Sequence, residues 1–200
     1  MKLSCLLVLL LCGVLPIFGQ AAKKPITAPR EKKTDIPQSM AESVSNTLQF
    51  AEDNLLGISE AMPEDKYNFV PTMGKFDDVR SFGEQVKHVA CAQFAFFNEF
   101  EGKQPPADCE KGGHDPAKSK AELIKYLKDS YDYGNHVLAT LTAKNALDRV
   151  EGRYAGPNTK LGISVTAVWH ITDHYGQLVE YLRMNGVVPP MTQKYGLKVR

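Results

Sequence analysis

The stretch Ala167-Val-Trp-His-Ile-Thr-Asp-His-Tyr-Gly-Gln177 holds two histidines, His170 and His174, four positions apart. On a helix, residues at this spacing share one face and lie one turn apart, with roughly 6 Å between their Cβ atoms. The flanking positions on that face are apolar, and they are Ile163, Ala167, Leu178 and Tyr181. We therefore expect a helix whose inner face carries two imidazoles, close enough for both to reach one metal ion.

The ends of this helix are marked in the sequence. It should begin near Leu161 or Ile163. Asn185-Gly186 supplies the left-handed residue that ends many helices, and Pro189-Pro190 should prevent the helix from restarting.

Three further segments repeat apolar residues at helical spacing. The first covers residues 40–62. The second runs from a capping box, Ser81 with Glu84, to about residue 101, and its apolar residues go nearly all the way round, which predicts a deeply buried helix. The third begins at Asp115-Pro116 or at Ser119 and ends near residue 142.

No stretch alternates between apolar and polar residues as strands do. Four long helices without a strand predict an all-α fold, a four-helix bundle with long connections at residues 63–80, 102–113 and 144–160. We place this single domain at residues 38–190, followed by a polar tail at residues 191–200.

The first 21 residues have the layout of a secretory signal peptide. Lys2 precedes an almost wholly apolar run that ends at Phe18, and small residues suited to cleavage follow. The run is shorter than the ~20 apolar residues of a spanning helix, and an uncleaved anchor is the alternative. Residues 22–37, rich in lysine and proline, read as a tether. We expect an exported protein, periplasmic or extracellular, with no stable membrane span after cleavage.

The charge balance gives no indication of a nucleic-acid partner. The chain has 24 basic and 23 acidic residues. Loss of residues 1–21 removes one base, Lys2, and leaves 23 of each sign. A chain of zero net charge has no general attraction to nucleic acid or to anionic membranes, so we expect no nucleic-acid partner.

Two cysteines, Cys91 and Cys109, remain after cleavage. In the oxidising environment of an exported protein they could form a disulfide that closes a short loop. The alternative is a buried free Cys91 that packs as a small hydrophobe, with Cys109 exposed.

His88 is the only other histidine inside a strongly buried predicted helix. Ala92 and Ala95 share its face, which leaves room for a site. In a bundle, ligands converge from facing helices, so His88 could join His170 and His174. Three nitrogens with an open fourth position are typical of a catalytic zinc site, and they should lie within ~4 Å of one another.

The other two histidines have simpler interpretations. His114 lies in a glycine-rich connection and is expected to be solvated, and His136 lies beside the apolar stripe of the third helix and should be partly exposed. For the three buried histidines, the alternative to a metal is a set of core polar residues that bond to carboxylates or tyrosines.

Several phrases follow one another in a recognisable order. Ser81-Phe-Gly-Glu-Gln-Val-Lys-His88 is followed by His170-x-x-x-His174-x-x-Gln177 and by Tyr181-Leu-Arg-Met-Asn-Gly186 with its proline pair, and Tyr67-Asn-Phe-Val-Pro71 precedes them all. In this order the chain resembles the DinB-like (damage-inducible) superfamily of metal-binding four-helix bundles. The resemblance covers residues 38–190.

The resemblance implies a divalent metal, usually zinc or nickel, bound by His88, His170 and His174. It implies homodimers in many members. It also implies kinship with thiol-dependent transferases and isomerases that use bacillithiol, mycothiol or glutathione, in which the metal activates the sulfur of the thiol.

The chemistry of such a site leaves several functions open. A metal on three histidines lowers the pKa of a bound water or thiol towards neutrality. Asp173, about 60° around the helix from His170, could act as a base, hold a histidine ring or be a solvated acid. Gln177, three residues after His174, could contact a bound ligand or satisfy the polar end of the cavity.

Three functions compete. The first is a metal-dependent transferase or hydrolase that takes an unknown small molecule at the open metal position. The second is a non-catalytic metal-binding or stress-related module. The third is a bundle whose histidines are only core polar residues.

Overall fold

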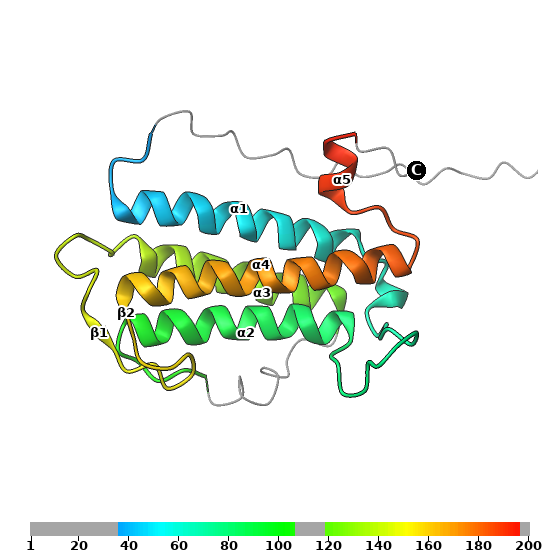
Figure 1. Ribbon diagram of the computed structural model, residues 1–200, viewed down its shortest axis with the longest axis horizontal. Coiled ribbons are helices and arrows are strands. Elements are labelled where there is room, and N and C mark those ends of the chain that lie inside the picture. Colours follow the sequence, from blue (N-terminus) through cyan, green and yellow to red (C-terminus); the bar gives the residue numbers. More distant parts are fainter. Residues whose placement is uncertain (1–35, 107–118, 197–200) are drawn as a thin grey trace, which may run out of the picture. The chain divides into compact units, whose positions relative to one another are not determined.

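The computed structural model describes residues 36–106 and 119–196. All of them belong to one compact unit of the chain, Lys33–Arg200. The predicted signal peptide, most of the predicted tether, His114 and Cys109 lie outside the described residues. The fold is all-α, as predicted, and Figure 1 shows its four long helices side by side. They are α1 (Met40–Ala61), α2 (Phe82–Phe100), α3 (Lys120–Leu138) and α4 (Lys160–Met184).

Side-chain caps set where each long helix begins. Ser39, Ser81, Ser119 and Thr159 each accept a hydrogen bond from the backbone N–H three residues further on. Ser81 and Ser119 belong to full capping boxes, so Ser119 is the N-cap of α3. These bonds satisfy N–H groups that have no partner inside the helix.

The helices run in two directions. α1 and α4 run one way, and α2 and α3 run the other way, so the pairs α1/α4 and α2/α3 are parallel (Figure 1). Lys120 at the start of α3 donates to the carbonyls of Glu60 (2.8 Å) and Met62 (2.6 Å) at the end of α1. A short 3-10 turn, Glu64–Lys66, leads from α1 towards α2.

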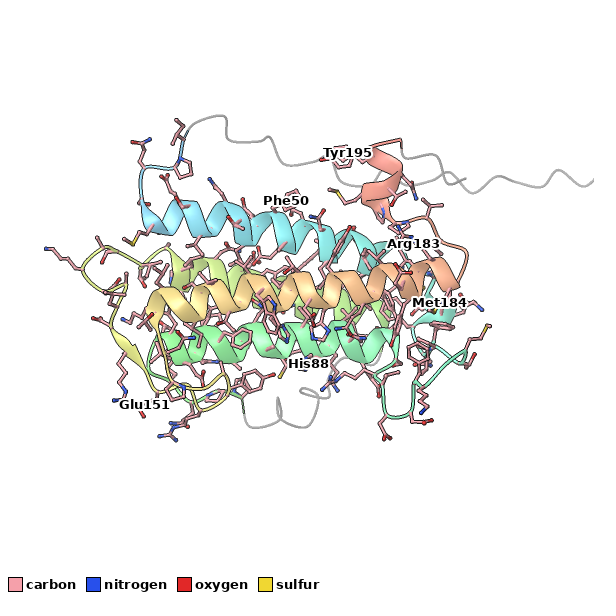
Figure 2. The ribbon with its side chains drawn as sticks, in the orientation of Figure 1. Phe50, His88, Glu151, Arg183, Met184 and Tyr195 are labelled. Carbon is pink, nitrogen blue, oxygen red and sulfur yellow. The ribbon has the colours of Figure 1, made fainter. Side chains whose placement is uncertain are left out.

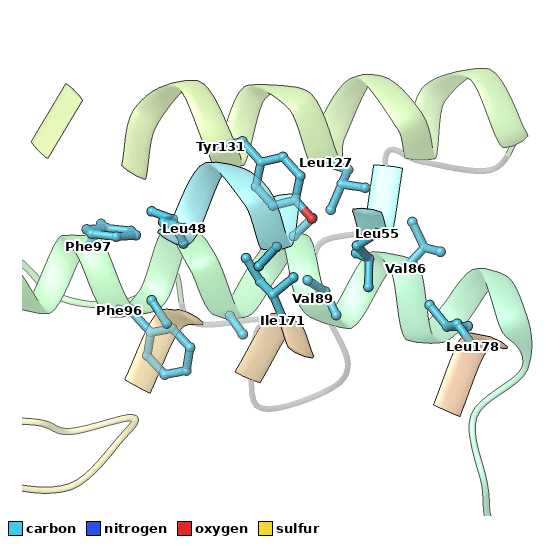
Figure 3. Close-up of a cluster of buried hydrophobic side chains, with 14 of the residues drawn as sticks. Leu48, Leu55, Val86, Val89, Phe96, Phe97, Leu127, Tyr131, Ile171 and Leu178 are labelled. Carbon is cyan, nitrogen blue, oxygen red and sulfur yellow. The ribbon is translucent and has the colours of Figure 1, made fainter. Parts of the chain in front are cut away.

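All four long helices contribute to one apolar core (Figure 3). The core is dense enough that α2 and α3 meet at a glycine, because a Cβ at Gly134 would lie 2.7 Å from the ring of Phe97. Fully buried side chains from each helix include Leu48, Leu55, Val86, Phe97, Leu127, Ile171 and Leu178.

The connection at residues 144–160 corrects the prediction that no strand is present. Arg149–Val150 (β1) and Asn158–Thr159 (β2) form a two-stranded antiparallel pair. Gly152 takes a positive φ of 64° between them, and a Cβ there would collide with the carbonyl of Gly156. Strands of two residues are too short to show alternation, so the sequence pattern could not reveal them.

The helix ends also differ from prediction in two places. α3 ends at Leu138, short of residue 142, because Thr142 and Asn145 bond each other's backbone N–H and form a turn. A short helix α5 (Pro190–Lys194) begins where the proline pair was expected to prevent one. Proline suits the first helical position, where its missing N–H would have no partner anyway. Gly186 does end α4 as predicted, with a φ of 70°.

Cys91 is fully buried on α2 and is disulfide-bonded. Of the two alternatives for Cys91, this agrees with a disulfide and not with a free thiol, but Cys109 lies outside the described residues, so the pairing of the two stays a prediction. Among the helices that the structure describes, none is long and apolar enough to cross a membrane.

Candidate metal centre

Hydrogen bonds on either side of the predicted site join α2 and the residues before it to α4. Near the start of α2, the Tyr181 hydroxyl donates to the backbone carbonyl of Arg80 at 3.0 Å. Further along α2, the fully buried Gln93 donates from Nε2 to the carbonyl of Ala167 at 3.2 Å. These two contacts set the register of the antiparallel helices, and the predicted site lies between them.

The structure brings His88, His170 and His174 together. The ring centroids are 5.0 Å apart for His88 and His170, 4.9 Å for His88 and His174, and 4.6 Å for His170 and His174. One ligand nitrogen from each ring lies within 4.8 Å of the others, somewhat wider than the ~4 Å expected. Figure 2 labels His88 on α2, alongside α4.

Burial keeps all three rings neutral. It lowers the pKa of His88 to about 4 and the pKa of His170 to about 3, and it also lowers the pKa of His174. The Arg80 guanidinium pushes all three pKa values in the same direction, because a nearby cation disfavours a second positive charge. Neutral imidazoles offer lone pairs, which is the form that binds metals.

A hydrogen-bonded chain of polar side chains extends from His174. Its Nδ1 lies 2.6 Å from Oε1 of Gln85 on α2. Gln85 donates from Nε2 to Oε1 of Gln177 on α4 at 3.1 Å, and Gln177 donates from Nε2 to Oδ2 of Asp173 at 2.9 Å. Asp173 is exposed and accepts from Gln177, which agrees with the solvated acid among its three predicted roles and not with a direct partner of a histidine ring.

Gln85 was not predicted as a functional residue. It is nearly fully buried, and it lies three residues before His88, just as Gln177 lies three residues after His174. That matched spacing puts each glutamine on the same helix face as a histidine, and it is the signal that could have found Gln85.

Two aromatic rings pack in sequence next to His170. The Phe96 ring packs edge-on against His170 with centroids 5.3 Å apart, and Tyr154 packs on Phe96 at 5.6 Å. The backbone N–H of Tyr154 donates to the buried carboxylate of Glu99. The segment between β1 and β2 is thereby attached to α2 beside the histidines. Of the remaining described histidines, His136 is exposed on α3, away from the group.

The donor set fits a divalent cation. Nε2 of His88 and Nε2 of His170 face each other at 3.1 Å. Two lone pairs at that distance repel, so the contact requires either a proton on one ring or a cation between them. Tetrahedral zinc with nitrogen ligands at about 2.1 Å places those nitrogens at a similar separation. The three histidines thus form a group that could hold a metal ion.

Solved structures share this fold. A conserved protein from Enterococcus faecalis has 17% identity and a TM-score of 0.59, with 74% of this chain and 97% of that chain covered. A DinB-like protein from Bacillus subtilis has 19% identity and a TM-score of 0.55, with 72% and 92% covered. A DinB-like protein from Bacillus cereus has 12% identity and a TM-score of 0.61, with 78% and 98% covered.

The family assignment rests on the sequence. No curated protein matches the chain. The sequence profile of the DinB superfamily matches residues 47–178, about two thirds of the chain, and this range contains His88, His170 and His174. The chain therefore belongs to the DinB superfamily.

Proposed function

We propose that this protein binds a divalent metal ion, zinc or nickel, through His88, His170 and His174. The observation that carries the proposal is the meeting of three neutral imidazoles from two helices, His174 buried and His88 and His170 half-buried, with ligand nitrogens within 4.8 Å of one another. An unfilled group of this kind leaves polar atoms in a largely apolar interior, which is costly. A shared cation would convert the three lone pairs into bonds.

The protein's own residues would shape such a site in three ways. Gln85 holds the His174 ring by its Nδ1, Phe96 shields the His170 ring on one side, and Arg80 adds positive charge near the group. Three protein ligands leave a coordination position for water or for a small molecule. A bound divalent metal supplies a nucleophile at neutral pH by lowering the pKa of that water.

The reaction that we propose is metal-dependent transfer or hydrolysis on a small molecule. A non-catalytic metal-binding or stress-related module is the second candidate. It is favoured by Asp173, whose carboxylate is engaged by Gln177 instead of being aimed at the histidines as a base.

The proposal includes export to the periplasm or the extracellular space. It rests on the apolar run at the start of the sequence, which lies outside the described residues. N-terminal sequencing of protein secreted by an expressing cell should find a chain that begins near residue 22. A product that retains Met1 would contradict export by cleavage. Size-exclusion chromatography of the same product tests the homodimer that family membership suggests.

Metal analysis tests the site directly. The wild-type protein, the variants His170→Ala and His174→Ala, and the control His136→Ala are purified, loaded with zinc or nickel and dialysed. His136 is an exposed histidine on α3, so its variant controls for surface binding to imidazole. We expect one metal per chain in the wild type and in the control, and loss of metal in both site variants.

Two results would count against the proposal. Full metal occupancy in His170→Ala and His174→Ala would show that the ion binds elsewhere. An absence of metal from a folded wild-type protein would leave the histidines as core polar residues. To separate enzyme from binding module, transfer and hydrolysis assays are run with and without metal, and turnover that survives metal removal excludes the mechanism proposed here.

A further inference from the structure

The hydrogen bonds that connect His174 to Asp173 through Gln85 and Gln177 all donate in one direction, towards Asp173. We propose that Asp173, Gln177 and Gln85 form a relay that fixes the tautomer of His174, with the proton on Nδ1 and the lone pair of Nε2 turned towards the metal position. The role of this tautomer rests on the proposed metal site, whereas the hydrogen bonds that set it are present without a metal. Asp173, Gln177 and Gln85 are positioning residues, because none of them is among the proposed ligands.

The direction follows from the carboxylate at the far end. A carboxylate only accepts hydrogen bonds, so the Gln177 group 2.9 Å from Asp173 must be its amide nitrogen. The carbonyl oxygen of Gln177 then faces Gln85, 3.1 Å away, and Gln85 must donate its own amide nitrogen. The carbonyl oxygen of Gln85 therefore faces His174.

The last step sets the ring. The Gln85 oxygen can only accept, and it lies 2.6 Å from Nδ1 of His174, so Nδ1 must carry a proton. A neutral imidazole has one N–H, so Nε2 keeps its lone pair. Metal-binding histidines commonly have this arrangement, in which the second ring nitrogen donates to a fixed acceptor.

The relay also crosses the helix interface twice. It starts on α4 at Asp173, reaches Gln85 on α2, and returns to α4 at His174. Gln85 is 4% exposed and His174 is 7% exposed, so water has little access to the bond between them, whereas Gln177 and Asp173 are exposed and water can reach their bond. His88 and His170 differ, because their buried Nδ1 atoms have no hydrogen-bond partner within the described part of the chain. Of the three rings, His174 is the one whose Nδ1 is hydrogen-bonded to a side chain among the described residues.

The tautomer is measured first in the metal-free protein. Long-range 1H–15N spectra distinguish a protonated from an unprotonated ring nitrogen. We expect His174 as the Nδ1–H form in the wild type. In Asp173→Ala the last acceptor is lost, either orientation of the two amides becomes allowed, and both tautomers should appear. A wild-type His174 protonated on Nε2 would overturn the relay.

A rescue variant separates direction from mere packing. In Asp173→Ala/Gln177→Glu, the new carboxylate at position 177 can only accept from Gln85, so the Nδ1–H form should return. Glu180→Ala is the matched control. It removes an exposed acid from the same helix, one that pairs with Arg183 and lies outside the relay. It should leave the tautomer unchanged.

Zinc affinity is the second readout. Loss of an outer partner of a metal-bound histidine typically weakens binding about 10–100-fold, and two amides separate Asp173 from the ring, so we expect about tenfold for Asp173→Ala. The rescue variant and the Glu180→Ala control should bind within about twofold of the wild type. Circular dichroism melts confirm that each variant is folded.

The outcomes distinguish this inference from the proposed function. If the wild type binds no zinc but His174 is the Nδ1–H form and Asp173→Ala mixes the tautomers, the relay stands and the metal proposal fails. If zinc binds but Asp173→Ala changes neither tautomer nor affinity, the metal proposal stands and the relay fails. If the double variant does not restore the Nδ1–H form, direction through the amides is wrong.

Discussion

Adding a single methyl group at Gly134 should measure how tightly the helix that carries His88 is packed. Gly134 lies on α3 and is buried against α2. A Cβ at this position would lie 2.7 Å from two carbons of the Phe97 ring. Carbon atoms pack best at about 3.5–4.0 Å, so something must move. Phe97 is fully buried, so its ring is surrounded by other residues.

The magnitude follows from comparison with a second helical glycine. A Cβ at Gly176 on α4 meets no atom within 4 Å, and Gly176 is exposed. Replacing glycine by alanine inside a helix gains about 1 kcal/mol at either site. Overpacking at Gly134 costs about 1–3 kcal/mol in addition. We therefore expect Gly176→Ala to stabilise the protein by about 1 kcal/mol and Gly134→Ala to be less stable than Gly176→Ala by about 1–3 kcal/mol.

Urea unfolding followed by circular dichroism measures both free energies. The difference between the two variants is the informative quantity, because the intrinsic helix preference cancels. Equal free energies of unfolding for Gly134→Ala and Gly176→Ala would refute the reasoning, since they would mean that α2 and α3 can separate at no cost. A large change in the urea dependence would indicate an altered unfolded state, and in that case thermal melts provide the comparison.

Three further outcomes are expected. Zinc at a concentration 100-fold above its dissociation constant should stabilise the fold by about 2.7 kcal/mol. In scanning calorimetry this should raise Tm by roughly 5–11 °C. An equal rise in Tm for His88→Ala would contradict binding at the site. The metal-free protein should lose free energy of unfolding as pH falls from about 6.5 towards 4. In the unfolded state the imidazoles bind protons near pH 6.5, whereas in the folded state the pKa of His88 is about 4 and that of His170 is about 3. The unfolded state therefore binds more protons over this range and gains stability relative to the folded state. A urea midpoint that does not change between pH 6.5 and pH 4 would argue against neutral rings in the fold. Lys120→Met should lower the free energy of unfolding in urea by about 1–2 kcal/mol, because it removes the hydrogen bonds to the Glu60 and Met62 carbonyls at the end of α1. An unchanged free energy of unfolding would show that water replaces these hydrogen bonds.

The sequence by itself determined the helices and the three histidines. Ser81 and Ser119 mark helix starts through bonds to residues three positions away, and His170 and His174 share a face because they are four positions apart. Such signals depend on short separations along the chain, where one helix geometry fixes the distance. The sequence also indicated the family, because its motifs follow one another in the order typical of that family.

Only the tertiary structure decided which residues meet across the helices. The contacts of His88 with His170, Gln85 with His174, and Gln85 with Gln177 join residues 82, 89 and 92 positions apart. Their formation depends on the axial register of α2 against α4, and one turn of sliding would move each partner by about 5.4 Å, beyond hydrogen-bond reach. That register is fixed by core packing and by the Gln93 and Tyr181 bonds, which no local pattern encodes. Helical periodicity and burial therefore predicted the three histidines that could hold a metal ion, and helix packing decided which side chains contact them.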